Sequence, residues 1–303
     1  MKLTYNDSDL ILAPIAGFSN IALRSLSFQY GVGLAYTEMV SAKGLYYKSE
    51  NTSDLLKIGK DEKNTGVQLF GSDPGIISEV ITYDVLKDFP VIDINAGCPV
   101  PKIVKNGDGS ALMRNPSLIY DIIKSAVSTS NNRPVTIKLR KGISGLNNVL
   151  ECALAAEEAG ASLVTVHGRT REQMYTGTAD LDIIAEVKSK LKIPVCGNGD
   201  VVDRATYLKM KETGVDYVMI ARGVLGKPYI FSEVQGIDFT YDIKDLMLKH
   251  IDYMTYLPEK VLMSILRGQL IQYLKGVHSA KRMKEAIFKC TTIQELKETI
   301  QTF

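Results

Sequence analysis

Long apolar runs are absent from this sequence of 303 residues. No stretch of about eighteen uncharged apolar residues occurs, so we expect no membrane-spanning helix. The first residues also lack the charged, apolar and small-residue pattern of a leader peptide, and we expect a cytoplasmic protein that makes no membrane contact. Cysteine is scarce as well. The four cysteines form no CxxC pair and no Cys/His cluster, which predicts free thiols and no metal site, at Cys98, Cys152, Cys196 and Cys290.

Net charge is small, and the formal value of +2 gives no reason by itself to expect nucleic acid. The distribution of charge is more informative, because seven basic residues and only one acidic residue, Glu285, lie between positions 260 and 289. Such a segment can neutralise phosphates, although the solvated face of a helix is the alternative. The basic residues are Lys260, Arg267, Lys275, Lys281, Arg282, Lys284 and Lys289.

Short apolar runs recur along the first 220 residues. Eight of them are typical of buried strands, at residues 10–13, 34–37, 66–69, 91–94, 135–139, 163–166, 193–196 and 217–220. Amphipathic helical patterns separate most of them, at residues 20–30, 75–87, 117–128, 147–159, 181–190 and 204–213. This alternation predicts an α/β fold, the (β/α)₈ TIM barrel. A doubly wound open sheet is the rival, but it would carry a glycine fingerprint in its first strand–helix turn, and residues 14–17 do not form one.

Helix ends are marked by capping residues. Asp73 and Asn115, each followed by proline, predict helix starts, while Gly160 and Gly214 predict helix ends. After about residue 235 the strand-like runs stop, and residues 242–256, 259–274, 280–290 and 293–300 have helical patterns. We therefore expect a barrel domain over residues 1–238 and a small helical domain over residues 239–303.

The segment from residue 91 to residue 116 joins a buried strand to a distinctive loop. Cys98 lies just past the expected end of the strand, and Pro99 and Pro101 stiffen what we expect to be a non-helical loop. Lys102 and Lys105 make this loop basic. A thiol in such a place is positioned for chemistry with a polar or anionic partner, and a buried structural cysteine is the alternative.

Polar and mostly cationic residues follow the ends of the other strands, where TIM barrels collect their active-site residues. The last two strand–helix loops of this fold most often hold a phosphate. Gly199 and Gly223 allow close backbone approach there, and Arg222 adds a cation. These loops therefore predict a phosphorylated ligand, with plain connecting turns as the alternative.

Several motifs resemble, in matching order, those of the tRNA-dihydrouridine synthases, flavoenzymes that reduce uridine in tRNA. The central one is N-A-G-C-P-V-P-K followed by G-D-G-S-A-L-M-R-N-P, at residues 95–116. The others run over about two hundred residues, which makes the set more specific than any one motif. They are L-A-P-I-A-G-F-S-N, Y-T-E-M-V-S-A-K-G-L, V-Q-L-F-G, I-K-L-R-K-G, V-H-G-R-T-R-E-Q and G-N-G-D.

This resemblance implies FMN as the cofactor, NADPH as the reductant and tRNA as the partner, and it implies no protein partner. The implied cofactor-binding residues are Pro14, Ile15, Ala16, Gln68, Lys138, His167, Asn198, Gly199, Asp200, Ala221 and Arg222. Cys98 is the implied proton donor in the reduction of the uracil double bond. The substrate-binding residues would be Asn95, Lys102, Lys105, Arg140, Arg169, Arg171, Arg267, Lys281 and Arg282.

The C-terminal segment resembles the family less well than the barrel does. Gln269 and Gln272 occupy positions where the family commonly has histidine and tryptophan, so the detailed tRNA contacts and the modified position stay open. Two other functions also remain. The basic C-terminal segment argues against a flavin barrel that reduces a free pyrimidine or another enone. The set of Cys98, Lys138 and His167 argues against a non-catalytic RNA-binding barrel.

Overall fold

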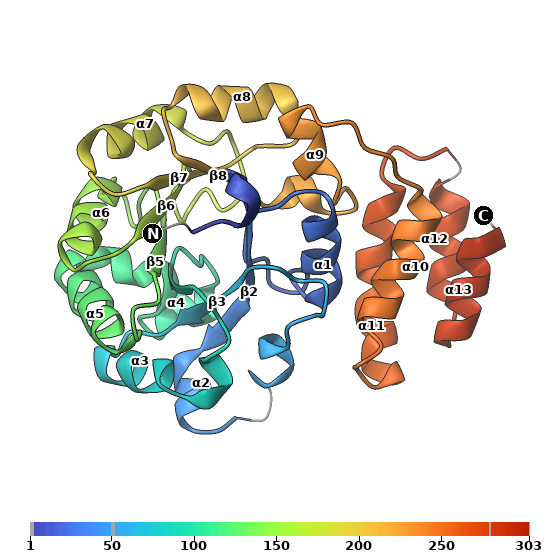
Figure 1. The fold of residues 1–303 in the computed structure, drawn as a ribbon, viewed down its shortest axis with the longest axis horizontal. Coiled ribbons are helices and arrows are strands. Elements are labelled where there is room, and N and C mark those ends of the chain that lie inside the picture. The colour runs from blue at the N-terminus through green and yellow to red at the C-terminus, as the bar shows by residue number, and fades with distance from the viewer. Residues whose placement is uncertain (1–2, 50–51, 279, 303) are drawn as a thin grey trace.

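The computed structural model describes residues 3–49, 52–278 and 280–302. Its first part is a closed barrel of eight parallel strands in sequence order, with β8 paired to β1 (Figure 1). The strands are β1 Leu10–Leu12, β2 Leu34–Ser41, β3 Thr65–Phe70, β4 Ile92–Ala96, β5 Val135–Arg140, β6 Leu163–His167, β7 Val195–Asn198 and β8 Tyr217–Ile220. The predicted (β/α)₈ barrel is therefore confirmed.

Both faces of the strands are buried, which explains their continuous apolar runs. One core lies between the sheet and the surrounding helices and includes Leu10 and Val67. A second core fills the barrel interior and includes Ile11, Tyr36 and Cys196. Cys196 is thus a core residue, as its position in an apolar run indicated.

Helices surround the barrel on the outside (Figure 1). The predicted caps form: Asp73 and Asn115 accept hydrogen bonds from the third residue of α3 and α5. Gly160 and Gly214 have φ values of +99° and +81°, a backbone conformation that suits glycine after a helix end. The helices are α1 Ile21–Gln29, α2 Ala42–Tyr46, α3 Pro74–Ile81, α4 Pro101–Lys105, α5 Pro116–Thr129, α6 Val149–Glu158, α7 Leu181–Lys190, α8 Arg204–Glu212 and α9 Ile230–Gln235.

The loop after β4 differs from our prediction of a non-helical segment. Pro101 begins the short helix α4, and a 3₁₀ helix follows at Gly109–Arg114. The first position of a helix needs no backbone donor, so proline fits there and does not exclude a helix. The short helices α2 and α9 were likewise not predicted.

Four helices after the barrel form a compact bundle beside α1 (Figure 1). They are α10 Ile243–Tyr253, α11 Glu259–Leu270, α12 Ala280–Lys289 and α13 Ile293–Thr302. Their core includes Leu246, Leu266 and Ile287 and extends to Ala22 and Leu26 of α1. The bundle is therefore packed on the barrel through α1. The expected boundary after residue 238 falls in the connection between α9 and α10.

None of the helices in the described part of the chain is both long enough and apolar enough to cross a bilayer.

Candidate active site

A cavity of about 190 Å³ opens at the barrel mouth, where the carboxyl ends of the strands meet. A second hollow of about 360 Å³ adjoins it over the loops after β7 and β8, and the two share His167, Asn198 and Arg222. We call the pair the mouth cavity. Its lining includes all eleven predicted cofactor residues as well as Asn95, Cys98 and Arg140. The structure therefore brings these sequence-distant residues together.

Cys98 lies two residues beyond the end of β4 on the wall of the mouth cavity, and its residue is only 8% exposed. Asn95 holds this turn, because its Oδ1 accepts the backbone N–H of Gly97 at 3.2 Å and that of Cys98 at 2.9 Å. Burial raises the pKa of the Cys98 thiol, opposed by smaller effects from the Val100 amide and nearby cations. The sulfur is therefore held at the cavity as a protonated thiol at neutral pH.

A buried hydrogen-bond chain supports this turn from inside the barrel. Asn95 Nδ2 donates to Gln68 Oε1 at 2.7 Å, and Gln68 Nε2 donates to Asp93 Oδ2 at 2.6 Å. Asp93 Oδ1 accepts from the Thr136 hydroxyl at 2.6 Å, which contacts the Tyr36 hydroxyl at 3.1 Å. Asp93 was not among the predicted site residues. The sequence did carry a sign of it, since a carboxylate stands two positions before Asn95 within an apolar strand and must face the same side.

Burial raises the pKa of Asp93 to about 6, against the opposing effect of its hydrogen bonds. Burial and the charge of Arg140 lower the pKa of Lys138 to about 8, while Asp93 opposes that shift. The Lys138 ammonium makes no hydrogen bond or ion pair within the described ranges. It therefore lies on the cavity wall as a cation available to a ligand.

His167 ends β6 and is 8% exposed, and its imidazole makes no hydrogen bond in the described part of the molecule. Burial lowers its pKa far below the usual value, and the charges of Lys138, Arg140, Arg169 and Arg222 lower it further. The imidazole is therefore neutral in a strongly positive field. An anionic ligand in the mouth cavity would compensate that field.

The loops after β7 and β8 form a cradle for such an anion. Gly199 has φ +137°, and a Cβ there would come within 2.5 Å of the Ala179 side chain. A Cβ at Gly223 would meet the Val201 carbonyl oxygen at 2.4 Å. The backbone amides of Gly199, Asp200 and Gly223 have no acceptor in the described ranges. Free amides beside a cationic arginine are what a phosphate group requires.

Two of the predicted substrate-binding arginines turn inward. Arg140 donates to the carbonyl oxygens of Gly97, Thr170 and Met174, which fastens neighbouring loops while it still lines the cavity. Arg169 is 2% exposed. It donates to the Thr176 and Gly177 carbonyl oxygens and to Asp200. Its guanidinium therefore faces its own loop and Asp200, and a contact between Arg169 and an RNA phosphate stays a prediction.

The other basic residues near the mouth are more accessible. Lys102 and Lys105 are exposed on α4, directly after the Cys98 turn. Arg171 is half-buried, with its guanidinium 3.7 Å from Glu172. These three cations therefore lie on the same rim of the barrel as the mouth cavity.

The helical bundle presents a second group of cations. Lys281 and Arg282 are exposed at the start of α12. Arg267 is half-buried, and its guanidinium donates to the Cys290 carbonyl oxygen at 2.5 Å. Arg267 therefore joins two helices of the bundle, which leaves Lys281 and Arg282 as the freer of the predicted contacts.

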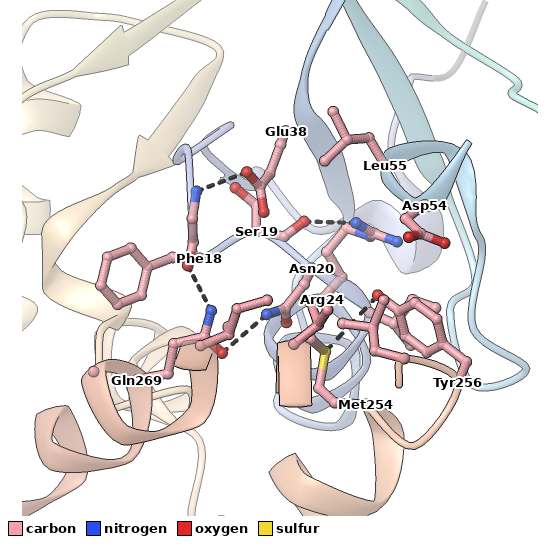
Figure 2. A pocket seen from close by; sticks show the side chains of 16 residues that line it. Phe18, Ser19, Asn20, Arg24, Glu38, Asp54, Leu55, Met254, Tyr256 and Gln269 are labelled. Carbon is pink, nitrogen blue, oxygen red and sulfur yellow. Dashed lines mark hydrogen bonds between the residues drawn. The ribbon is translucent and has the colours of Figure 1, made fainter. Parts of the chain in front are cut away.

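A separate pocket of about 380 Å³ lies between the barrel and the bundle (Figure 2). We call it the interdomain pocket. Gln269 closes one side, where its Nε2 donates to the Gly17 carbonyl oxygen at 2.5 Å and its Oε1 accepts from Asn20 at 3.0 Å. The lining residues are Gly17, Phe18, Ser19, Asn20, Ile21, Arg24, Glu38, Asp54, Leu55, Met254, Tyr256, Leu257, Val261, Ile265, Gly268 and Gln269.

Comparison with known proteins gives consistent results. Residues 11–303 match the family model described as Dihydrouridine synthase (Dus). The chain is 38% identical over 256 residues to tRNA-dihydrouridine synthase B of Vibrio cholerae, covering 80% of this chain and 79% of that protein. It is 32% identical over 309 residues to the "Probable tRNA-dihydrouridine synthase" of Rickettsia conorii, covering 98% and 93%. Among solved structures, TcOYE with pHBA has a TM-score of 0.56 at 12% identity, with coverage of 75% and 89%, and shares the fold.

Proposed function

Because this chain belongs to the dihydrouridine synthase family, we propose that it reduces specific uridines of tRNA to dihydrouridine, with FMN as its cofactor and NADPH as its reductant. One observation carries the proposal: the Cys98 thiol lies on the same cavity as Lys138 and His167. The Cys98 thiol can donate a proton, Lys138 is a cation, and the neutral His167 imidazole can donate one hydrogen bond. These three groups around one cavity suit the reduction of a uracil ring beside a flavin.

The residues of the mouth cavity fit FMN. Its phosphate would accept hydrogen bonds from the free amides at Gly199, Asp200 and Gly223 and pair with Arg222. Ala221 and Asn198 frame that cradle, with the Asn198 amide held by the Met219 carbonyl oxygen at 2.8 Å. The flavin ring would lie against the turn made by the residues Pro14, Ile15 and Ala16, with Gln68, Lys138 and His167 around its polar edge.

FMN, when bound, supplies the hydride that reduces the uracil double bond. The protein supplies the proton from Cys98 Sγ, and burial keeps that sulfur protonated at neutral pH. Asn95 uses one amide hydrogen to bind Gln68 and its Oδ1 to hold the Cys98 turn. Its second amide hydrogen makes only a weak contact with Met39 Sδ, at 3.8 Å. That hydrogen can donate to a uracil carbonyl. Arg140 lines the same side of the cavity.

A uridine must leave the base stack of tRNA to enter this cavity, as enzymes that act on bases generally require. Lys102, Lys105 and Arg171 lie on the rim where the backbone of such a nucleotide would pass. Lys281 and Arg282 of the helical domain extend the basic surface. Phosphate contacts of this kind position an RNA without reading its sequence.

The purified protein should be incubated with NADPH and tRNA from a strain that lacks dihydrouridine, and the products mapped by position. We expect dihydrouridine at defined positions. Reduction of free uracil or another enone without any product on tRNA would instead favour a small-molecule reductase, and a colourless protein that binds tRNA would favour a non-catalytic role.

A further inference from the structure

We propose that the interdomain pocket is a second nucleobase site, which holds the base adjacent to the reduced uridine and favours a base that carries an amino group. This inference rests on the proposed function and deepens it. It concerns how the RNA strand is read next to the reacting nucleotide.

The pocket lies directly beside the mouth cavity. The turn after β1 separates them, because Ala16 lines the mouth cavity and Gly17 lines the interdomain pocket. The end of β2 also separates the two cavities, because Met39 lines the mouth cavity and Glu38 lines the interdomain pocket. The two cavities therefore adjoin across these two backbone segments, and our proposal places the nucleotide next to the reduced uridine in the interdomain pocket.

The pocket walls suit an aromatic base and do not suit a phosphate. Tyr256 gives it an aromatic side (Figure 2), and Phe18, Leu257 and Ile265 are also among its lining residues. Bases stack on such side chains in single-stranded RNA recognition. A volume of about 380 Å³ leaves room for one base.

Arg24 is the one arginine of the lining, and it is not available to an anion. It is 2% exposed, and its guanidinium binds the Glu62 carboxylate and the carbonyl oxygens of Ser19 and Lys57. The other charged residues of the lining are acidic, Glu38 and Asp54. Lys57 pairs with Asp54 at 2.7 Å, and its ammonium lies 4.6 Å from the centre of the Tyr256 ring. The Glu38 carboxylate is therefore the lining charge that a phosphate would meet, and it disfavours one.

Glu38 gives the pocket its selectivity. Its Oε2 accepts the Gly17 backbone N–H at 2.6 Å, and its Oε1 has no partner in the described part of the chain (Figure 2). The side chain is half-buried, and burial raises its pKa. A half-buried carboxylate oxygen accepts from an exocyclic amino group, as acidic side chains do with cytosine N4. The uracil O4 at the equivalent place is itself an acceptor.

Val261→Trp tests the site, because Val261 is 45% exposed on the pocket rim and the substitution fills the pocket without disturbing a core. Ser264→Trp is the matched control, since Ser264 is exposed on the same helix and does not line the pocket. We expect V261W to weaken tRNA binding at least tenfold. The slope of log Kd against log salt should stay unchanged, because no phosphate contact is lost. Flavin content and flavin reduction by NADPH should be unchanged in both variants.

Free nucleosides test the selectivity. In saturation-transfer NMR, cytidine should bind the native protein more strongly than V261W, and Glu38→Gln should reduce the difference between cytidine and uridine. Equal tRNA affinity for V261W and S264W would overturn the proposal, and so would a flattened salt slope. Mapping of dihydrouridine with the native protein in the same samples tests the proposed function separately, so either idea can fail alone.

Discussion

Gln269 joins the helical domain to the barrel, and its removal gives a sharp test of the interface. Its Oε1 accepts from Asn20 Nδ2 at 3.0 Å and from His250 Nε2 at 2.7 Å, and its Nε2 donates to the Gly17 carbonyl oxygen. Burial lowers the pKa of His250 to about 4, so its ring is neutral, and Nε2 carries the hydrogen while Nδ1 faces the Tyr273 hydroxyl.

Gln269→Leu keeps a similar volume and leaves two buried donors without an acceptor. Asn20 and His250 are 8% and 3% exposed, whereas the Gly17 carbonyl oxygen belongs to an exposed residue that water can reach. Each unpaired buried donor costs about 1–3 kcal/mol, so we expect the free energy of unfolding to fall by about 3 kcal/mol after a partial gain from the added apolar surface.

Urea unfolding followed by circular dichroism measures this loss, and limited proteolysis of the connection between α9 and α10 reports on the interface. Gln272→Leu is the control, because Gln272 lies one turn further along and its side chain, among the residues that the structure describes, bonds only the Gly268 carbonyl oxygen, at 3.2 Å. A loss below about 0.5 kcal/mol for Q269L, or an equal loss for Q272L, would refute the reasoning.

Three further perturbations test other parts of the account. Lys138→Met should weaken FMN binding and slow flavin reduction by NADPH about tenfold, measured by stopped-flow absorbance, since a cation at the flavin edge favours the reduced form. The double variant Lys281→Glu with Arg282→Glu should lower the slope of log Kd against log salt for tRNA binding by between about one and two, because two phosphate contacts are lost. Lys190→Glu on α7 should leave that slope unchanged. Asp93 has a pKa of about 6 in the native state and the usual value of 3.8 in the unfolded state. The unfolded state therefore loses its proton first, and the free energy of unfolding falls as pH rises from 4 to 7. Relative to the native chain, Asp93→Asn should therefore gain about 2 kcal/mol over that range, and a pH-independent difference in urea midpoints would contradict this.

The barrel could be predicted from the sequence because its strands are buried on both faces and give continuous apolar runs. Cys98 could be placed at the site for a related reason, since a residue just past a barrel strand must lie at the mouth. The family motifs then supplied roles for its neighbours, and the structure gathers these residues around one cavity.

Side-chain direction in loops could not be predicted in the same way. Arg169 and Arg171 stand two positions apart, yet Arg169 is buried against Asp200 and Arg171 is not. Nothing in the local sequence distinguishes them, because the difference depends on where the β7 loop lies. Gln269 is a similar case. Its departure from the family pattern was visible, but its bonds to Gly17 join residues 252 positions apart.

The central claim is that Cys98 donates a proton to a uracil held beside a flavin. The most direct measurement reduces the flavin of Cys98→Ala with NADPH, mixes it anaerobically with unmodified tRNA, and follows flavin reoxidation at single turnover. We expect native flavin content and native reduction by NADPH, with reoxidation by tRNA slowed at least a hundredfold, the lower range for the loss of a general acid. Reoxidation at the native rate, with dihydrouridine formed, would contradict the account.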